Sequence, residues 1–342
     1  MTAPSGATWS YLIVYVGTLA LHVGFMSYVL AGSGVVALSA ALGERRAKPL
    51  EPIVATLRDW LPFSLGAAIT AGVTPLLFVQ ILYEESFYSA NLLLFHRWMA
   101  VVPVVMAGFY LLYLGKADRV GGRLRVLVAG GAFLCFAFTA YSWAENHLLS
   151  IDRDAWPAFY GEGRLFYTSP QLAARVAMWI FGAAPIMACI VGWQHRRRDD
   201  STKVTQPLAV IAAVGTVGAL VAGIALPIDR AHVLDLARPY VIGAAVGLVL
   251  QLGAWGSIAA RRALSLRALV GASLGLAVAV ICTAIAREHI RWSALHTESL
   301  TSAHQRSAEA GGTVVFAFFL VVNTVVIAWC VHTANARKSS GD

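Results

Sequence analysis

The chain has 342 residues, of which 58% are hydrophobic and 13% are charged, and its formal net charge is +8. A soluble domain is typically about one-quarter charged, so this composition indicates an integral membrane protein. The basic residues lie in short connections between apolar runs, which is typical of residues that set membrane orientation and not of a nucleic-acid-binding surface.

Nine apolar runs predict an all-α integral membrane protein, a single bundle of about nine transmembrane helices over residues 1–342. Each run approaches the ~20 residues that cross a hydrocarbon layer of ~30 Å as a helix. Helices are expected because backbone groups in hydrocarbon must be hydrogen-bonded within the chain. The predicted spans are 11–42, 59–83, 91–114, 122–148, 170–194, 206–227, 237–260, 267–286 and 312–335.

The distribution of lysine predicts the orientation of this bundle. All the lysines, which are Lys48, Lys116, Lys203 and Lys338, lie in the odd-numbered connections or in the C-terminal tail. By the positive-inside rule, the N-terminus lies outside and the C-terminus lies in the cytoplasm. An odd number of spans likewise places the two termini on opposite sides of the membrane.

Cysteine usage excludes several kinds of site. The four cysteines all lie in apolar runs, and none belongs to a CxxC pair or a CxxCH motif. A disulfide framework, a zinc or iron–sulfur site and covalently attached haem are therefore not expected.

His22 is the clearest pointer to chemistry, because ionisable groups inside a membrane are costly and usually functional. It lies about 11 residues into the first span, or roughly 16 Å along it. A neutral imidazole is a good axial ligand for haem iron. The alternative is a histidine hydrogen-bonded to a neighbouring helix inside the bundle.

Further polar residues are predicted at the outer level of the bundle. His96 and Arg97 lie near the outer end of the third span. His96 could be a haem ligand and Arg97 could bind a haem propionate through its guanidinium; alternatively, the two form an interfacial pair beside the headgroups. The remaining members lie at the ends of other spans, where they could position haem propionates or conduct protons, or be merely solvated. They are Gln80, Glu145, His147, Glu288, His289 and Arg291.

Several stretches together resemble subunit I of the bacterial cytochrome bd quinol oxidases, in a shortened and diverged form. LHVGFMSYVLAGSGVVALSAALGERR resembles the first helix of that family, and GAAITAGVTPLLFVQILYEESFYS resembles the second, with Gln80 at the place of a family glutamine. AYSWAENHLLSIDRDAW resembles the fourth helix and the segment after it. REHIRW resembles the outer motif after the eighth helix.

This resemblance implies nine spans, a bacterial inner-membrane location and haem ligands. His22 matches an early histidine that binds a haem of the oxygen-reducing site. Glu288 matches a haem-liganding glutamate, and Arg291 matches the arginine three residues after it. One or two b-type haems are therefore expected, with quinone as a further ligand.

The chain also departs from the family pattern. The histidine and methionine that hold the low-potential haem fall near Ala174 and near Val241 or Ile242, so both ligands are missing. The long external quinol-binding loop is reduced to about nine residues, 228–236, and the glutamates of the third helix are missing as well. A complete terminal oxidase is therefore not expected.

The function expected from these observations is that of a lipid-embedded subunit of a bd-like respiratory complex. It would bind b-type haem near the outer face and exchange electrons between quinone and a c-type cytochrome or another redox subunit. A haem-free membrane anchor for redox subunits is the first alternative. A transporter with a polar path along His22, His96 and Arg175 is the second, weakened by the lack of an internal repeat.

Overall fold

A computed structural model gives the fold of the chain. It describes residues 5–117, 121–164, 166–226, 231–295 and 297–309, together with scattered positions between 314 and 329; the side chains of 231–236 and 297–299 are not described. The chain divides into two compact units, residues 13–295 and residues 1–12 with 296–342. The ninth predicted span, 312–335, lies largely outside the described residues.

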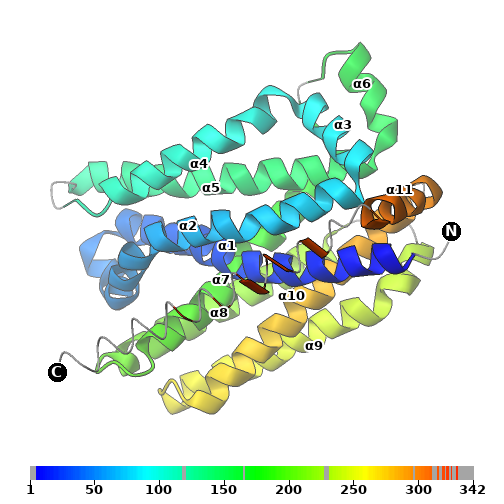
Figure 1. Cartoon of the computed structure of the whole chain (residues 1–342). Helices are drawn as coiled ribbons and strands as arrows, with labels where there is room; N and C mark the ends of the chain where they lie inside the picture. Colours follow the sequence, from blue (N-terminus) through cyan, green and yellow to red (C-terminus); the bar gives the residue numbers. More distant parts are fainter. Residues whose placement is uncertain are drawn as a thin grey trace. The chain divides into compact units, whose positions relative to one another are not determined.

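The described residues form helices and no strands (Figure 1). In chain order the α-helices are α1 (Gly6–Ala47), α2 (Glu51–Leu82), α3 (Glu84–Leu94), α4 (His96–Leu114), α5 (Gly122–Ile151), α6 (Trp156–Gly161), α7 (Pro170–His195), α8 (Ser201–Ile224), α9 (Ala231–Arg261), α10 (Leu266–Ala294) and α11 (Thr297–Glu309).

Seven segments are long and apolar enough to cross a membrane among the described residues. The first of them, Gly6–Leu82, contains both α1 and α2, and the other six lie in α4, α5, α7, α8, α9 and α10. Near its end, α1 is kinked at Gly43, whose φ of 74° favours glycine. The protein is therefore an all-α, multi-pass membrane protein.

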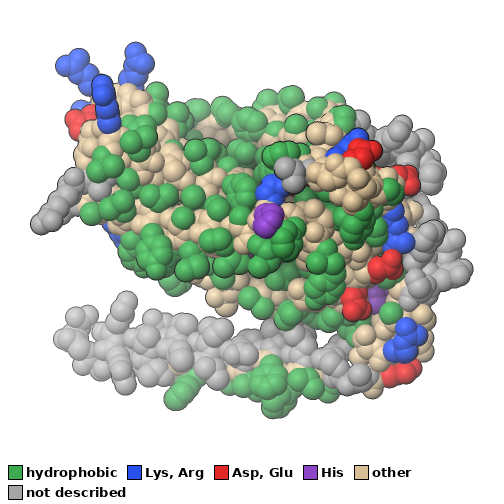
Figure 2. Space-filling view, turned by 90° about the horizontal axis from the view of Figure 1, so that it is seen from above, with side chains coloured by type: hydrophobic (Ala, Val, Ile, Leu, Met, Phe, Trp, Pro, Cys, Tyr) green, Lys and Arg blue, Asp and Glu red, His purple; other side chains and the backbone are tan. Residues whose placement is uncertain are grey.

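The arrangement of residues 13–295 separates the polar and apolar parts of the surface. The connections α1/α2, α4/α5, α7/α8 and α9/α10 lie at one end of the bundle (Figure 1). These four connections carry the basic runs of the sequence. Figure 2 shows hydrophobic side chains across the middle of one face and charged side chains mainly toward its ends, as a lipid-exposed surface requires.

Three helices differ from the spans predicted from sequence. The run 91–114 is broken at Phe95, whose φ is 29°, so its first residues belong to α3 and His96 begins α4. The chain at Glu288 and Arg291 does not follow the eighth helix, because α10 continues to Ala294. Similarly, α5 contains Glu145 and His147, as the predicted span 122–148 did, but continues three residues further, to Ile151. Hydropathy underestimated the lengths of α5 and α10, because buried polar residues occupy the last turns of both helices.

Close backbone contact joins α9 to α10. A Cβ atom added at Gly247 would lie 2.5 Å from the Gly275 carbonyl oxygen, and one added at Gly275 would lie 2.6 Å from the Gly247 carbonyl oxygen. Small residues at such a crossing let two transmembrane helices pack backbone to backbone. The core beside this pair includes Trp255, Ile258 and Leu269, which are all buried.

The smaller unit contains α11 and the first turns of α1. Within it, Thr8 Oγ1 and His304 Nδ1 form a buried hydrogen bond of 2.9 Å. The His304 ring also meets the Tyr11 ring edge to face, with 6.1 Å between the ring centroids.

Candidate functional site

A buried network of polar side chains surrounds the carboxylate of Glu288 on α10. Tyr83, which directly follows the last residue of α2, donates to Glu288 Oε2 at 2.7 Å. Arg287 donates to Oε1 at 3.0 Å, and Arg291 donates to Oε2 at 3.5 Å. Arg287 also donates to the Tyr15 hydroxyl on α1 at 2.5 Å. Three hydrogen bonds to this carboxylate, together with the bond from Arg287 to Tyr15, tie α1 and the end of α2 to α10 at one level of the bundle.

Burial and the adjacent Glu288 carboxylate raise the pKa of Tyr83 well above its ordinary value of 10.0. Tyr83 is 2% exposed, so its phenolate form would lose hydration. The phenolate would also face the negative charge of Glu288. The hydroxyl therefore stays protonated and acts as a hydrogen-bond donor.

His147 on α5 joins the network through Arg291. The guanidinium of Arg291 donates to His147 Nδ1, and both side chains are buried. A guanidinium can only donate, so Nδ1 is the acceptor, and the neutral imidazole carries its proton on Nε2. That Nε2 is buried and has no hydrogen-bond partner among the described residues.

Arg175 on α7 lies beside the same network. It is 7% exposed and interacts electrostatically with Arg287, Arg291 and Glu288. Neither a hydrogen bond nor an ion pair joins its guanidinium to another described residue, and its Nε is buried. The network therefore contains three guanidinium groups and one carboxylate.

A second, separate ion pair lies nearby between α4 and α5. Arg97 Nη2 lies 2.9 Å from Glu145 Oε1, and Glu145 is fully buried. The backbone N–H of Tyr167 donates to the same oxygen at 3.0 Å. The Arg97 guanidinium also lies 4.6 Å from the centre of the Phe166 ring. These contacts occupy the Arg97 guanidinium, which the sequence analysis considered as a haem-propionate partner. Arg97 and Glu145 therefore join α4 to α5 and to residues 166 and 167.

His22 lies in α1 on the same side as Tyr15, since seven residues are close to two helical turns. Its Nδ1 lies 2.9 Å from the Ala68 carbonyl oxygen on α2. A carbonyl can only accept, so Nδ1 carries the proton and Nε2 of the neutral ring has a lone pair. Gly72 leaves room for the ring, because a Cβ atom there would lie 2.9 Å from His22 Cε1.

Two other predicted residues lie apart from the network. His96 is exposed at the first position of α4 and contacts the Phe95 ring. Gln80 is half-buried in the last turn of α2, and no hydrogen bond joins it to the described part of the network. The structure thus brings together His147, Glu288 and Arg291, and it places Glu145 with Arg97 in a neighbouring pair.

Sequence reasoning missed the two tyrosines of the network. Tyr15 and Tyr83 are uncharged and lie in or beside apolar runs, so nothing in their composition sets them apart from core aromatics. A usable signal was the seven-residue spacing from Tyr15 to His22, which places both on one helical face.

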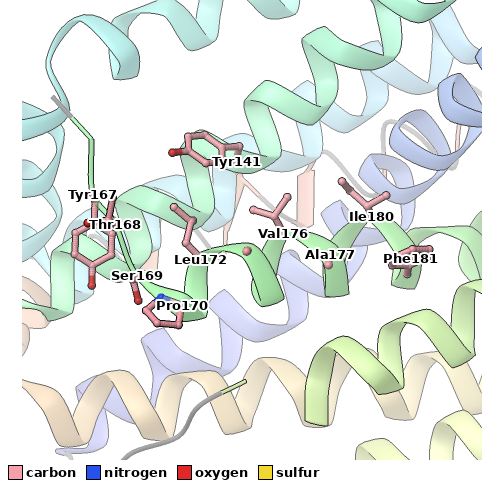
Figure 3. A pocket seen from close by; sticks show the side chains of 11 residues that line it. Tyr141, Tyr167, Thr168, Ser169, Pro170, Leu172, Val176, Ala177, Ile180 and Phe181 are labelled. Carbon is pink, nitrogen blue, oxygen red and sulfur yellow. The ribbon is translucent and has the colours of Figure 1, made fainter. Parts of the chain in front are cut away.

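An apolar groove of about 860 Å³ runs along α7 (Figure 3). Leu172, Val176 and Ile180 line it, and Tyr141 and Tyr167 flank one part of it. The Tyr167 hydroxyl donates to Asp152 at 2.8 Å, and burial together with this carboxylate raises the pKa of Tyr167. The groove is suited to hydrocarbon chains.

No protein-family model matches the chain, and no curated protein matches its sequence. Among the residues that the structure describes, no three His, Cys, Asp or Glu side chains lie together as a protein-only metal site would require.

Proposed function

We propose that the protein is a haem-binding membrane subunit of a respiratory electron-transfer complex similar to the cytochrome bd quinol oxidases. The observation that carries this proposal is the hydrogen bond from His22 Nδ1 to the Ala68 carbonyl. Histidines that ligate metals usually donate their other ring N–H to a carbonyl or carboxylate, which fixes the ring and presents the free nitrogen. His22 has this arrangement within an apolar helix.

Of the two candidate axial ligands of the haem iron, His22 and Glu288, the surroundings of His22 fit that role better. The Nε2 lone pair of His22 is the atom that would bind the iron of a b-type haem. Glu288 fits less well, because both of its oxygens already accept hydrogen bonds. We therefore assign iron binding to His22, and we assign to Glu288 the positioning of Arg287 and Arg291.

When bound, the haem would supply one-electron transfer; the protein would orient it, exclude water and neutralise its carboxylates. Arg291 is the residue we propose for carboxylate binding. The apolar groove along α7 is where the hydrocarbon tail of a quinone would lie. A c-type cytochrome or other redox subunit of the bacterial inner membrane would complete the electron path.

The test is the haem content of the purified, full-length protein. We expect a reduced-minus-oxidised difference spectrum of a b-type haem and haem in a pyridine hemochrome assay. The His22→Ala variant should lose that haem, whereas His289→Ala should keep it, because the contact that the described residues give His289 is stacking on Tyr240, with 5.1 Å between the ring centroids.

Wild-type protein without haem would reject the proposal. Haem content that is unchanged in His22→Ala would reject His22 as the ligand. Intact assembly with redox subunits in the absence of haem would instead favour the haem-free anchor.

A further inference from the structure

The buried network holds more positive than negative charge. Arg175, Arg287 and Arg291 contribute three guanidinium groups, while Glu288 is the carboxylate that interacts with all three. Arg175 and Arg291 are 7% and 6% exposed, so water screens their repulsion poorly. Buried charges are normally paired, because an unpaired buried ion loses its hydration without compensation.

The unused hydrogen-bond donors belong to this same group of residues. Nε of Arg175, Nε of Arg291 and Nε2 of His147 are each buried without a partner among the described residues. All three are donors, since Arg291 occupies Nδ1 of His147. A group that satisfies them must therefore be an acceptor, and the excess positive charge favours an anion over a neutral acceptor.

We propose that Arg175, Arg291 and His147 form a buried binding site for one anionic oxygen group, a carboxylate or a phosphate. Arginine suits either group, because its planar fork matches their paired oxygens. The His147 N–H adds a neutral donor. Glu288 lies next to the site and holds Arg291 in place by accepting its hydrogen bond at 3.5 Å.

This site does not depend on iron at His22. A haem propionate would supply the anion if the proposed function holds, and the headgroup phosphate of an anionic lipid would supply it otherwise. The lysine distribution predicts that this end of the bundle faces outward, so a lipid would come from the outer leaflet.

The sign of the stability change in Arg175→Gln tests the site. In an empty site, Arg175 is repelled by two other guanidinium groups, so its removal should raise the thermal unfolding midpoint of the detergent-purified full chain. In an occupied site, Arg175 neutralises the anion, so its removal should lower the midpoint by about 3 °C or more. Arg153→Gln is the control, because Arg153 pairs with the exposed Glu85, and a shift of about 1 °C or less is expected.

The source of the anion is identified on the same samples. Native mass spectrometry after detergent exchange should detect one retained phospholipid on the wild type, or a hemochrome assay should detect haem. Either should be lost in Arg175→Gln. Delipidated protein should be stabilised by phosphatidylglycerol vesicles more than by phosphatidylcholine vesicles if the anion is a lipid phosphate.

Three results would overturn the inference: a midpoint that is unchanged or raised in Arg175→Gln, a wild type that retains neither lipid nor haem, or equal retention by both proteins. If Arg175→Gln does not fold, Arg175→Lys replaces it. That variant keeps the charge but loses the fork, so it should fold and retain less of the anion than the wild type.

Discussion

The Tyr83 hydroxyl donates to the Glu288 carboxylate at 2.7 Å and joins the end of α2 to the last turns of α10. The two residues are 205 positions apart in the sequence, and both are buried. The bond therefore depends on the docking of two helices that no local pattern connects.

Replacing Tyr83 by Phe should destabilise the folded protein by about 1.5–3 kcal/mol, the range for a hydrogen bond to a charged group. Urea unfolding followed by circular dichroism in mild detergent would measure the change. Tyr88→Phe is the matched control, since Tyr88 lies on α3 and is 46% exposed. Equal effects of the two substitutions would contradict the importance of the Glu288 contact.

Tyr83 should also make the protein sensitive to alkali. Its folded-state pKa lies well above 10.0, so the folded state keeps a proton that the unfolded state loses. Its stabilising contribution is complete below pH 10.0 and is lost as the pH rises toward the folded-state pKa. Raising the pH above 10.0 should therefore lower the thermal unfolding midpoint of the wild type more than that of Tyr83→Phe. Parallel pH profiles for the two proteins would count against this assignment.

Glu288→Gln should be among the most damaging single substitutions, at about 3–5 kcal/mol, because it leaves buried guanidinium groups without their carboxylate. Chemical unfolding of the purified variant would show the loss. Glu85→Gln removes a carboxylate that is 69% exposed and should change stability by about 1 kcal/mol or less. A small effect of Glu288→Gln would contradict the role of Glu288 as the carboxylate that holds Arg287 and Arg291.

Gly72→Ala should disturb His22, because the added Cβ would lie 2.9 Å from its Cε1 and 3.0 Å from its Nδ1. The ring must move away from Ala68, and we expect a lower haem content in a hemochrome assay. Gly66→Ala on the same helix has no heavy atom within 4 Å of the new Cβ and should match the wild type. Normal haem content in both variants would show that the ring position does not control haem binding.

Gly247→Val should prevent the close approach of α9 and α10. Its Cβ would lie 2.7 Å from the Ala279 backbone nitrogen, and backbone atoms cannot yield as a flexible side chain would. A lower yield of monodisperse protein in size-exclusion chromatography should follow. Gly253→Val lies on the same helix in open space and should be tolerated. Similar chromatograms for both variants would refute the packing role of Gly247.

Hydropathy predicted the α-helical membrane class and the approximate positions of α1, α2, α4, α5 and α7–α10, because long apolar runs have few other structures in lipid. The break at Phe95 was not predictable, since no proline or glycine marks it. The extension of α10 through Glu288 and Arg291 was missed because their charges resemble a solvated loop when their partners on α1, α2 and α5 are unknown. Helix packing decides which of the outer polar residues come into contact, and local sequence patterns do not predict that packing.

The close pairing of α9 and α10 bears on how the chain enters the membrane. A short connection joins the two helices, so they can insert together as a hairpin during synthesis. Arg287 and Arg291 then enter the bilayer with an apolar companion already beside them, after the segments that carry Tyr15, Tyr83 and His147. We expect the docking of this hairpin to close the arginine network, because Arg287 and Glu288 meet Tyr15 and Tyr83, and Arg291 meets His147, only when α10 packs against the helices inserted before it.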